Sequence, residues 1–195
     1  KYCGHILIAD RIKRNAFDAL ENLRILGVKK TVLLTGDVLS VARPIASKLN
    51  FDMLKAELRP EEKLAAVEYL MDNKGGGGTR AFVGDGINEA EVLRGADVGI
   101  ARGALGSDVS MENADILLMD KDIGKLPLAV KAARYTAAVV KVNTAAAAAL
   151  KLLLLAGGAA GFIPIALAAV ADAAVFTACM INSLRPLGAW KEQEE

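Results

Sequence analysis

The chain has 195 residues, a mass of 20.5 kDa and a formal net charge of +1, so its charge gives no indication of a nucleic acid or other polyanionic partner. Its two cysteines, Cys3 and Cys179, are far apart and form no Cys-x-x-Cys pattern, which argues against a disulfide-based fold or a thiolate metal cage within the chain. The length allows one packed domain with a further element attached, and the excess of apolar residues lies in the last third.

Short apolar runs alternate with helical patterns from Ile6 to Met119, which is typical of an α/β domain with a parallel sheet. Between the first two runs, apolar residues recur at helical spacing from Phe17 to Leu26, and Gly27 is expected to end that helix. The expected strands are Ile6–Ala9, Thr31–Leu34, Met53–Ala56, Ala81–Val83, Val98–Ala101 and Ile116–Met119.

Thr35-Gly36-Asp37 follows the second expected strand and precedes a helix that contains Pro44, where a kink is predicted. A hydroxyl and the following N–H groups at the carboxyl end of a strand can hold a phosphoryl oxygen. Thr35 could equally be the N-cap of the helix, and spacing alone leaves both interpretations open.

The next helix opens with Pro60, which the first turn tolerates because its missing N–H has no partner there anyway. Lys63 then lies at the start of this helix, facing the same sheet edge. Such a lysine is by default a solvated charge, but beside a phosphoryl group it would offset the negative charge. The run Gly75–Gly78 is a connector, because no Gly-Lys-Ser/Thr follows it.

The stretch from Val83 to Glu89 is a strand-to-loop-to-helix corner, with a helix expected from Ile87 to Arg94. Such a corner leaves backbone N–H groups near a helix N-terminus, where phosphate binds well. Asp85, set between two glycines, offers hard oxygen to Mg²⁺. Gly-Asp-Gly alone also fits an ordinary tight turn.

From Ile123 the pattern becomes helical and then strongly apolar, and between Thr144 and Leu184 the only formal charges are Lys151 and Asp172. This stretch is too long and too apolar for a soluble core helix, and glycines followed by Pro164 divide it. Two transmembrane helices are therefore predicted, at about 138–158 and 162–184. Basic residues lie before the first span and after the second, so both ends are expected to face the cytoplasm.

Counted from a turn near residues 159–160, Lys151 lies about 13 Å along its helix and Asp172 about 18 Å, at 1.5 Å per residue. Opposite charges at similar depth in a bilayer should face each other or a polar path. A structural ion pair, or a wrongly assigned span, would explain them too, but an ion path is favoured because intramembrane ionisable groups are usually functional.

Thr35-Gly36-Asp37, Pro60–Lys63 and Gly84–Glu89, followed by a membrane hairpin, together resemble the C-terminal part of a P-type ATPase over essentially the whole chain. The branch that exports zinc, cadmium and lead fits best. The features similar to its last two helices are Asn143 and Lys151, then Asp172 and Asn182–Arg185, and residues 120–127 resemble its approach to the membrane.

The resemblance implies a haloacid-dehalogenase-like domain at residues 1–122, a cytoplasmic linker helix at 123–137, two membrane helices within 138–185 and a cytoplasmic tail at 186–195. It implies a multi-pass protein of the plasma membrane that exports divalent metal while ATP phosphorylates an aspartate. Asp172 would bind the transported Zn²⁺ or Cd²⁺, with Lys151 as a counter-charge that is not a ligand. Thr35, Gly36 and Lys63 would hold phosphoryl oxygens and Asp85 would bind Mg²⁺, in a catalytic set completed by Asp37, Asn88 and Glu89.

The chain departs from this family at several points. The Asp-Lys-Thr-Gly-Thr motif, the nucleotide and actuator domains and the Cys-Pro-Cys motif do not occur in these residues, so N-terminal domains of the same polypeptide are expected elsewhere and the chain alone is expected to be inactive. Glu89 and Glu91 stand where the family has aspartate and proline, and Val38 where it has a polar residue.

Three other interpretations compete. The pump could carry Cu⁺ or K⁺, or the chain could be a truncated, non-catalytic membrane protein of the same ancestry that binds Mg²⁺ or a partner. A soluble phosphatase is disfavoured by the apolar hairpin and because Asp10, which ends a strand, lacks the Asp-x-Asp pattern.

Overall fold

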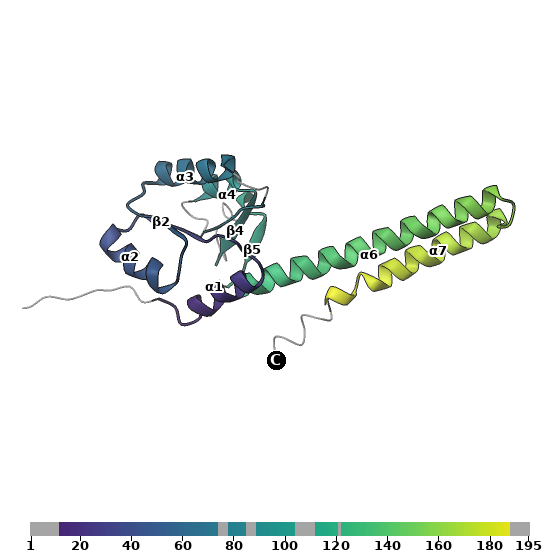
Figure 1. The fold of residues 1–195 in the computed structure, drawn as a ribbon, viewed down its shortest axis with the longest axis horizontal. Helices are drawn as coiled ribbons and strands as arrows, with labels where there is room; N and C mark the ends of the chain where they lie inside the picture. The colour runs from purple at the N-terminus through teal and green to yellow at the C-terminus, as the bar shows by residue number, and fades with distance from the viewer. Residues whose placement is uncertain (1–11, 74–77, 85–88, 104–111, 121, 188–195) are drawn as a thin grey trace, which may run out of the picture. The chain divides into compact units, whose positions relative to one another are not determined.

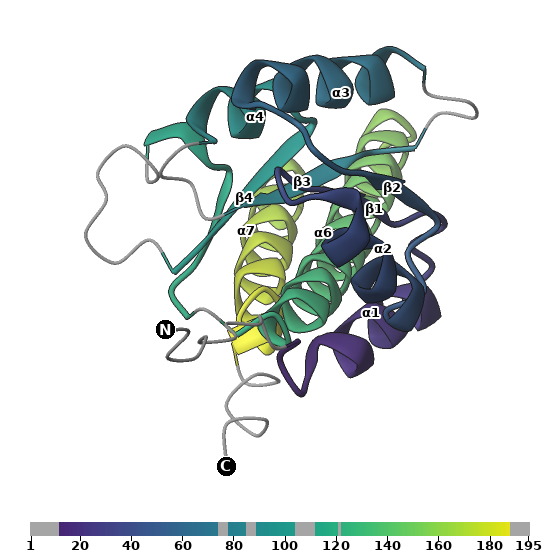
Figure 2. The same ribbon diagram turned by 90° about the vertical axis from the view of Figure 1, so that its left-hand side faces the viewer.

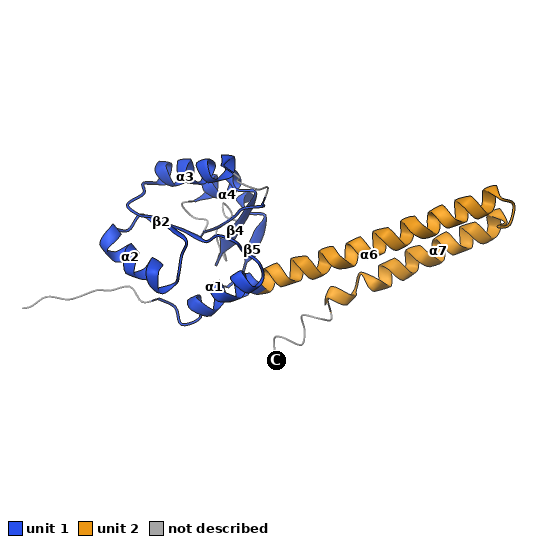
Figure 3. Ribbon diagram, in the orientation of Figure 1, with its two compact units in different colours: residues 1–127 blue, residues 128–195 orange. Residues whose placement is uncertain are grey.

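The computed structural model describes residues 12–73, 78–84, 89–103, 112–120 and 122–187 (Figure 1). The chain divides into two units, residues 1–127 and 128–195, which are described separately below (Figure 3). The boundaries expected at residues 122 and 137 remain predictions.

All strands of the first unit that the structure describes run parallel, in two hydrogen-bonded sheets. In the first sheet, β1 (Val32–Leu34) pairs with β2 (Met53–Lys55), and Leu33 lies opposite Leu54. The second sheet has the order β3 (Ala81–Gly84), β4 (Val98–Arg102), β5 (Ile116–Leu118). These strands confirm the predicted ones to within about one residue at each end, and the run Ile6–Ala9 lies outside the described residues.

In the first unit, α1 (Ala16–Ile25) precedes β1. Successive strands are then connected by α2 (Leu39–Lys48), α3 (Pro60–Asp72) and α4 (Ala90–Gly95). Gly27 ends α1 as predicted, because it adopts φ +83° and donates its N–H to the Arg24 carbonyl at 2.8 Å. Helix α2 continues through Pro44, so the kink there remains a prediction. Of the helix expected from Ile87, residues 87 and 88 lie outside the described residues, and the described part begins at Ala90.

The best-buried contact of the first unit joins α4 to β4. Leu93 and Ala101 are both completely buried, and Phe82, Ala114 and Leu117 pack against them. Helix α4 also contacts β3, and α3 lies beside α4, as Figure 2 shows. This packing fixes the start of α4, which directly follows Glu89.

A polar contact between a buried threonine and an exposed aspartate joins the start of β1 to the loop that follows α2. Thr31, only 8% exposed, donates both its backbone N–H and its hydroxyl to Asp52 Oδ2, at 2.6 and 2.8 Å. The backbone N–H of Thr31, then its hydroxyl, lower the pKa of the Asp52 carboxyl, and the nearby Arg24 charge adds to this effect.

The second unit is a helical hairpin formed by α6 (Lys125–Ala159) and α7 (Ile165–Asn182). By length and composition both helices could cross a membrane. Helix α7 begins at residue 165 instead of the expected 162, because Pro164 is its N-cap and Gly161, at φ +77°, makes the turn. Gly157 lies within α6, where a Cβ atom would come within 2.3 Å of Ile163 Cδ1 across the turn.

Replacing Gly99 with alanine tests the α4–β4 packing. The new Cβ would lie 2.5 Å from the Leu93 carbonyl oxygen, so we expect the free energy of unfolding of Gly99→Ala to fall by about 1–3 kcal/mol. Urea unfolding of the whole chain in detergent, followed by circular dichroism, measures this loss. Gly78→Ala is the matched control, because no atom lies within 4 Å of a Cβ at that position; equal stability of the two variants would contradict the packing described.

Acidification tests the Asp52 contact. Because folding lowers the pKa of Asp52, the ionised carboxylate stabilises the fold above its unfolded pKa, near 4, and this contribution is lost as the pH falls through the folded pKa. We therefore expect Asp52→Asn to show a smaller loss of stability than the unsubstituted chain when the pH is lowered from about 5 to about 2. Parallel pH-dependence curves of the two chains, measured by urea unfolding, would contradict this.

Candidate functional site

Polar residues follow the carboxyl ends of three strands. Thr35-Gly36-Asp37 follow β1, the segment that leads to Lys63 follows β2, and Glu89 comes after β3. The carboxyl ends of β1 and β2 lie at one edge of the first sheet, whereas β3 belongs to the second sheet. Ligands of α/β domains usually bind at such edges. Of the predicted site residues, Asp85 and Asn88 lie outside the described residues.

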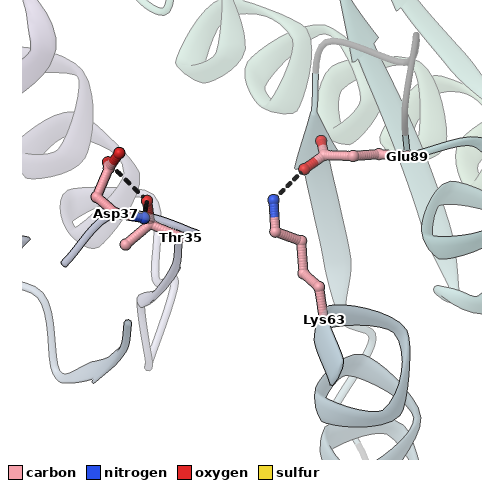
Figure 4. A network of polar contacts seen from close by, with 4 residues as sticks. All are labelled: Thr35, Asp37, Lys63 and Glu89. Atoms are coloured by element: carbon pink, nitrogen blue, oxygen red, sulfur yellow. Dashed lines mark hydrogen bonds and ion pairs between the residues drawn. The ribbon is translucent and has the colours of Figure 1, made fainter. Parts of the chain in front are cut away.

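Thr35 closes a tight turn with Asp37. Its Oγ1 accepts the Asp37 N–H at 3.1 Å and donates to Asp37 Oδ2 at 2.8 Å (Figure 4). The N-cap of α2 is Val38, so the alternative that Thr35 caps this helix is wrong. The hydroxyl of Thr35 instead shapes the loop that carries it.

The loop after β2 is hydrogen-bonded to this turn. Leu58 N–H donates to the Thr35 carbonyl at 3.1 Å, and Glu57 N–H donates to the Asp37 carbonyl at 2.9 Å. Glu57 Oε1 also accepts the Leu39 N–H at the start of α2, at 3.2 Å. A Cβ on Gly36 would lie 3.3 Å from the Leu58 carbonyl oxygen, so this glycine lets the two loops approach.

The sequence does not indicate the structural role of Glu57. The backbone of Glu57 adopts φ +60°, which is uncommon for a residue with a side chain. In this conformation Glu57 contacts both the turn at residues 35–37 and the start of α2. No signal in the surrounding sequence marks it, because Glu has no preference for this conformation.

Lys63 forms an ion pair with Glu89. The first turn of α3 is fixed by Glu62, whose carboxylate accepts the Arg59 N–H at 2.8 Å, and Lys63 follows it. Lys63 Nζ lies 2.5 Å from Glu89 Oε1, and the two side chains are only 19% and 17% exposed (Figure 4). Because α3 and α4 are packed together, the backbones that carry Lys63 and Glu89 are held in place relative to each other.

Gly84 leaves the space that the Glu89 carboxylate occupies. A Cβ at Gly84 would lie 2.3 Å from Glu89 Oε2. The Glu89 carboxylate therefore lies beside the backbone of Gly84 at the end of β3, and carboxylate oxygen is what Mg²⁺ prefers. An anion that binds here must compete with Glu89 for Lys63, and a cation must compete with Lys63 for Glu89.

The hairpin carries the second candidate site. Lys151 Nζ on α6 lies 3.5 Å from Asp172 Oδ1 on α7, which confirms that these two charges face each other. The preference for an ion path over a structural ion pair remains a prediction. Among the described residues no group of three or more His, Cys, Asp and Glu side chains could hold a metal ion by itself. A metal bound at Asp172 would therefore need further ligands of another kind or from elsewhere.

Comparisons with known proteins agree on one family. A model of haloacid dehalogenase-like hydrolases matches residues 1–97. A zinc-transporting ATPase of Synechocystis sp. is 44% identical over 95% of this chain and 26% of its own length, and a cadmium, zinc and cobalt-transporting ATPase of Bacillus subtilis is 38% identical over the same shares. The crystal structure of a zinc-transporting PIB-type ATPase in an E2.Pi state matches 92% of this chain and 28% of its own, with a TM-score of 0.82 and 36% identity. The chain thus spans about a quarter of the length of these relatives.

Replacing Glu89 with glutamine tests the competition at Lys63. Without the opposing charge, Lys63 becomes available to an anion, so we expect Glu89→Gln to bind orthophosphate about three- to tenfold more tightly in Mg²⁺-free buffer. Line broadening of the phosphate ³¹P signal in a titration with the whole chain in detergent measures this affinity.

Glu91→Gln is the matched control, because it removes the same charge from an exposed position in the first turn of α4. An equal change in both variants, or weaker phosphate binding in Glu89→Gln, would contradict a specific competition between Glu89 and the anion.

Proposed function

Because the chain belongs to the heavy-metal branch of the P-type ATPases, we propose that it acts in the ATP-driven export of divalent heavy-metal ions, with zinc and cadmium as the first candidates. The observation that carries this proposal is the contact between Lys151 and Asp172, which are the only formal charges between Thr144 and Leu184. Charged groups in a membrane helix are costly and are usually retained for transport of ions or protons. The names of the relatives support the choice of metal.

The chain's own residues would act on phosphate by positioning and by charge. The Thr35 hydroxyl, once released from Asp37 Oδ2, and the backbone N–H of Gly36 would hold phosphoryl oxygens, and the Lys63 ammonium would offset their negative charge. Asp37, which shapes this turn through Thr35, and Asn88 complete the proposed catalytic set with Glu89. The Asp-Lys-Thr-Gly-Thr motif does not occur in these residues, so the activity is proposed for the polypeptide that contains this region together with that motif.

The donor set at the end of β3 fits Mg²⁺. Asp85 and Glu89 would supply hard carboxylate oxygen, and the side-chain-free position of Gly84 leaves room for one of these carboxylates. When bound, Mg²⁺ supplies positive charge that neutralises the transferred phosphoryl group. Lys63 would compete with a bound Mg²⁺ for the Glu89 carboxylate.

Asp172 would bind the transported ion as a hard oxygen ligand, and zinc accepts carboxylate oxygen together with softer ligands. Lys151, 3.5 Å away, would lose its partner when the metal binds and regain it when the metal leaves. This exchange favours release of the ion, since the lysine repels a cation held by the same carboxylate.

We place the hairpin in the plasma membrane, with both of its ends in the cytoplasm. Basic residues gather before the first apolar stretch and follow the second, and such residues are enriched on the cytoplasmic side of membrane helices. They are Lys125, Lys131, Arg134 and Lys141 before it and Arg185 after it.

Asp172→Ala tests the metal assignment. In the polypeptide that carries both this region and the phosphorylated aspartate, we expect the variant to lose Zn²⁺- and Cd²⁺-stimulated phosphorylation from ATP by at least about tenfold, because a principal ligand is removed. Metal-stimulated phosphorylation is measured as the acid-stable label that the protein takes up from radiolabelled ATP. Asp72→Asn, which removes a charge from an exposed position at the end of α3, is the control. Stimulation by Cu⁺ or K⁺ with no response to Zn²⁺ would overturn the assignment.

A further inference from the structure

The two helices of the hairpin are joined by a second polar contact, which we call the amide latch and define as Asn143, Cys179, Asn182 and Ser183. Asn143 Nδ2 on α6 donates to the Cys179 carbonyl at 3.1 Å and to Ser183 Oγ at 2.9 Å on the α7 side. Asn143 Oδ1 accepts from Asn182 Nδ2 at 2.7 Å. The single side chain of Asn143 thus makes three hydrogen bonds across the hairpin.

The latch is suited to a membrane. Where lipid surrounds two helices, apolar surface gives little drive for their association, and interhelical hydrogen bonds and close packing hold them together. An amide is well suited to this position, because Asn143 offers two donor hydrogens and an acceptor to partners that face it from one turn of α7. Arg185 Nη1 donates to Asn182 Oδ1 at 3.4 Å, so the latch extends to a charged residue beyond the end of α7.

The latch and the ion pair impose the same register on the hairpin. Lys151 follows Asn143 by eight residues, about 12 Å along α6, and Cys179 follows Asp172 by seven residues, about 10.5 Å along α7. Both helices therefore span a similar distance between the two contacts. A slip of α7 by one residue would turn it by about 100° and carry Asp172 away from the face that meets α6.

We propose that Asn143 is a positioning residue for the metal site. The amide latch holds α7 at the rotation and height that bring the Asp172 carboxylate to Lys151, and therefore to the ion that Asp172 is proposed to bind. The role in metal transport rests on the proposed function, whereas the control of helix register does not. Asn143 itself lies about two turns from the charged pair and is not proposed as a ligand.

Carbodiimide cross-linking of the whole chain in lipid nanodiscs tests the register directly. Dicyclohexylcarbodiimide converts the Asp172 carboxylic acid to an O-acylisourea, which the neutral Lys151 amine attacks to give an amide and release dicyclohexylurea. Mass spectrometry of the digested chain measures the yield of this amide. We expect Asn143→Ala to lower the yield about three- to tenfold, in line with the strength of interhelical hydrogen bonds in membranes.

Thr177→Val is the matched control, because Thr177 Oγ1 donates to the Ala173 carbonyl within α7 at 2.9 Å and takes no part in the latch. Its cross-linking yield should equal that of the unsubstituted chain. Exchange of the two latch residues, Asn143→Ser together with Ser183→Asn, restores an amide and a hydroxyl across the hairpin and should recover most of the yield. Asn143→Ala with an unchanged yield and unchanged helical content would overturn the proposal.

The proposed role of Asn143 in metal transport is tested by a separate measurement. In the full pump, Asn143→Ala should raise the KM for Zn²⁺ several-fold while kcat changes less, because the variant misplaces a ligand without removing it. A lower cross-linking yield together with an Asp172→Ala variant that still responds to Zn²⁺ would uphold the latch and overturn the metal assignment. A normal KM for Zn²⁺ in Asn143→Ala would overturn the positioning role.

Discussion

A lysine and an aspartate that face each other between two apolar helices constrain the whole hairpin. By translocon-based insertion scales, each charge at the centre of a membrane helix costs about 3 kcal/mol. The contact between Lys151 and Asp172 offsets part of this cost only if α6 and α7 keep one register. The tight approach of Gly157 to Ile163 at the turn and the amide latch near the other end of α7 are consistent with that requirement.

The first unit contains a lysine–carboxylate pair of its own, formed by Lys63 and Glu89. In both pairs a mobile ion could replace one partner: phosphate would compete for Lys63, whereas a metal cation would compete for Asp172. The pairs differ in their surroundings, since Lys63 lies in α3 and Glu89 is the N-cap of α4, which packs against α3, whereas the other pair lies in the hairpin. In the proposed pump, each pair would therefore hold its charges together until the ion that replaces one of them arrives.

Much of this organisation could be predicted from the sequence. Alternating runs and helical spacing located the strands, Gly27 marked the end of α1, and equal depth along two apolar helices placed Lys151 opposite Asp172. The missed features depend on contacts between distant residues or on an unusual backbone. Asn143 bonds to residues 36 to 40 positions away, and the positive φ of Glu57 has no local signature. The exclusion of Thr35 as the N-cap of α2 likewise required the observed N-cap at Val38.

The central claim, that Asp172 binds the transported metal, is tested most directly by ¹¹³Cd NMR of Cd²⁺ bound to the chain in lipid nanodiscs. The account predicts a resonance in the range typical of oxygen ligands that disappears in Asp172→Asn and persists in Asp72→Asn. A resonance that survives Asp172→Asn, or that reports sulfur ligation through Cys179, would contradict it.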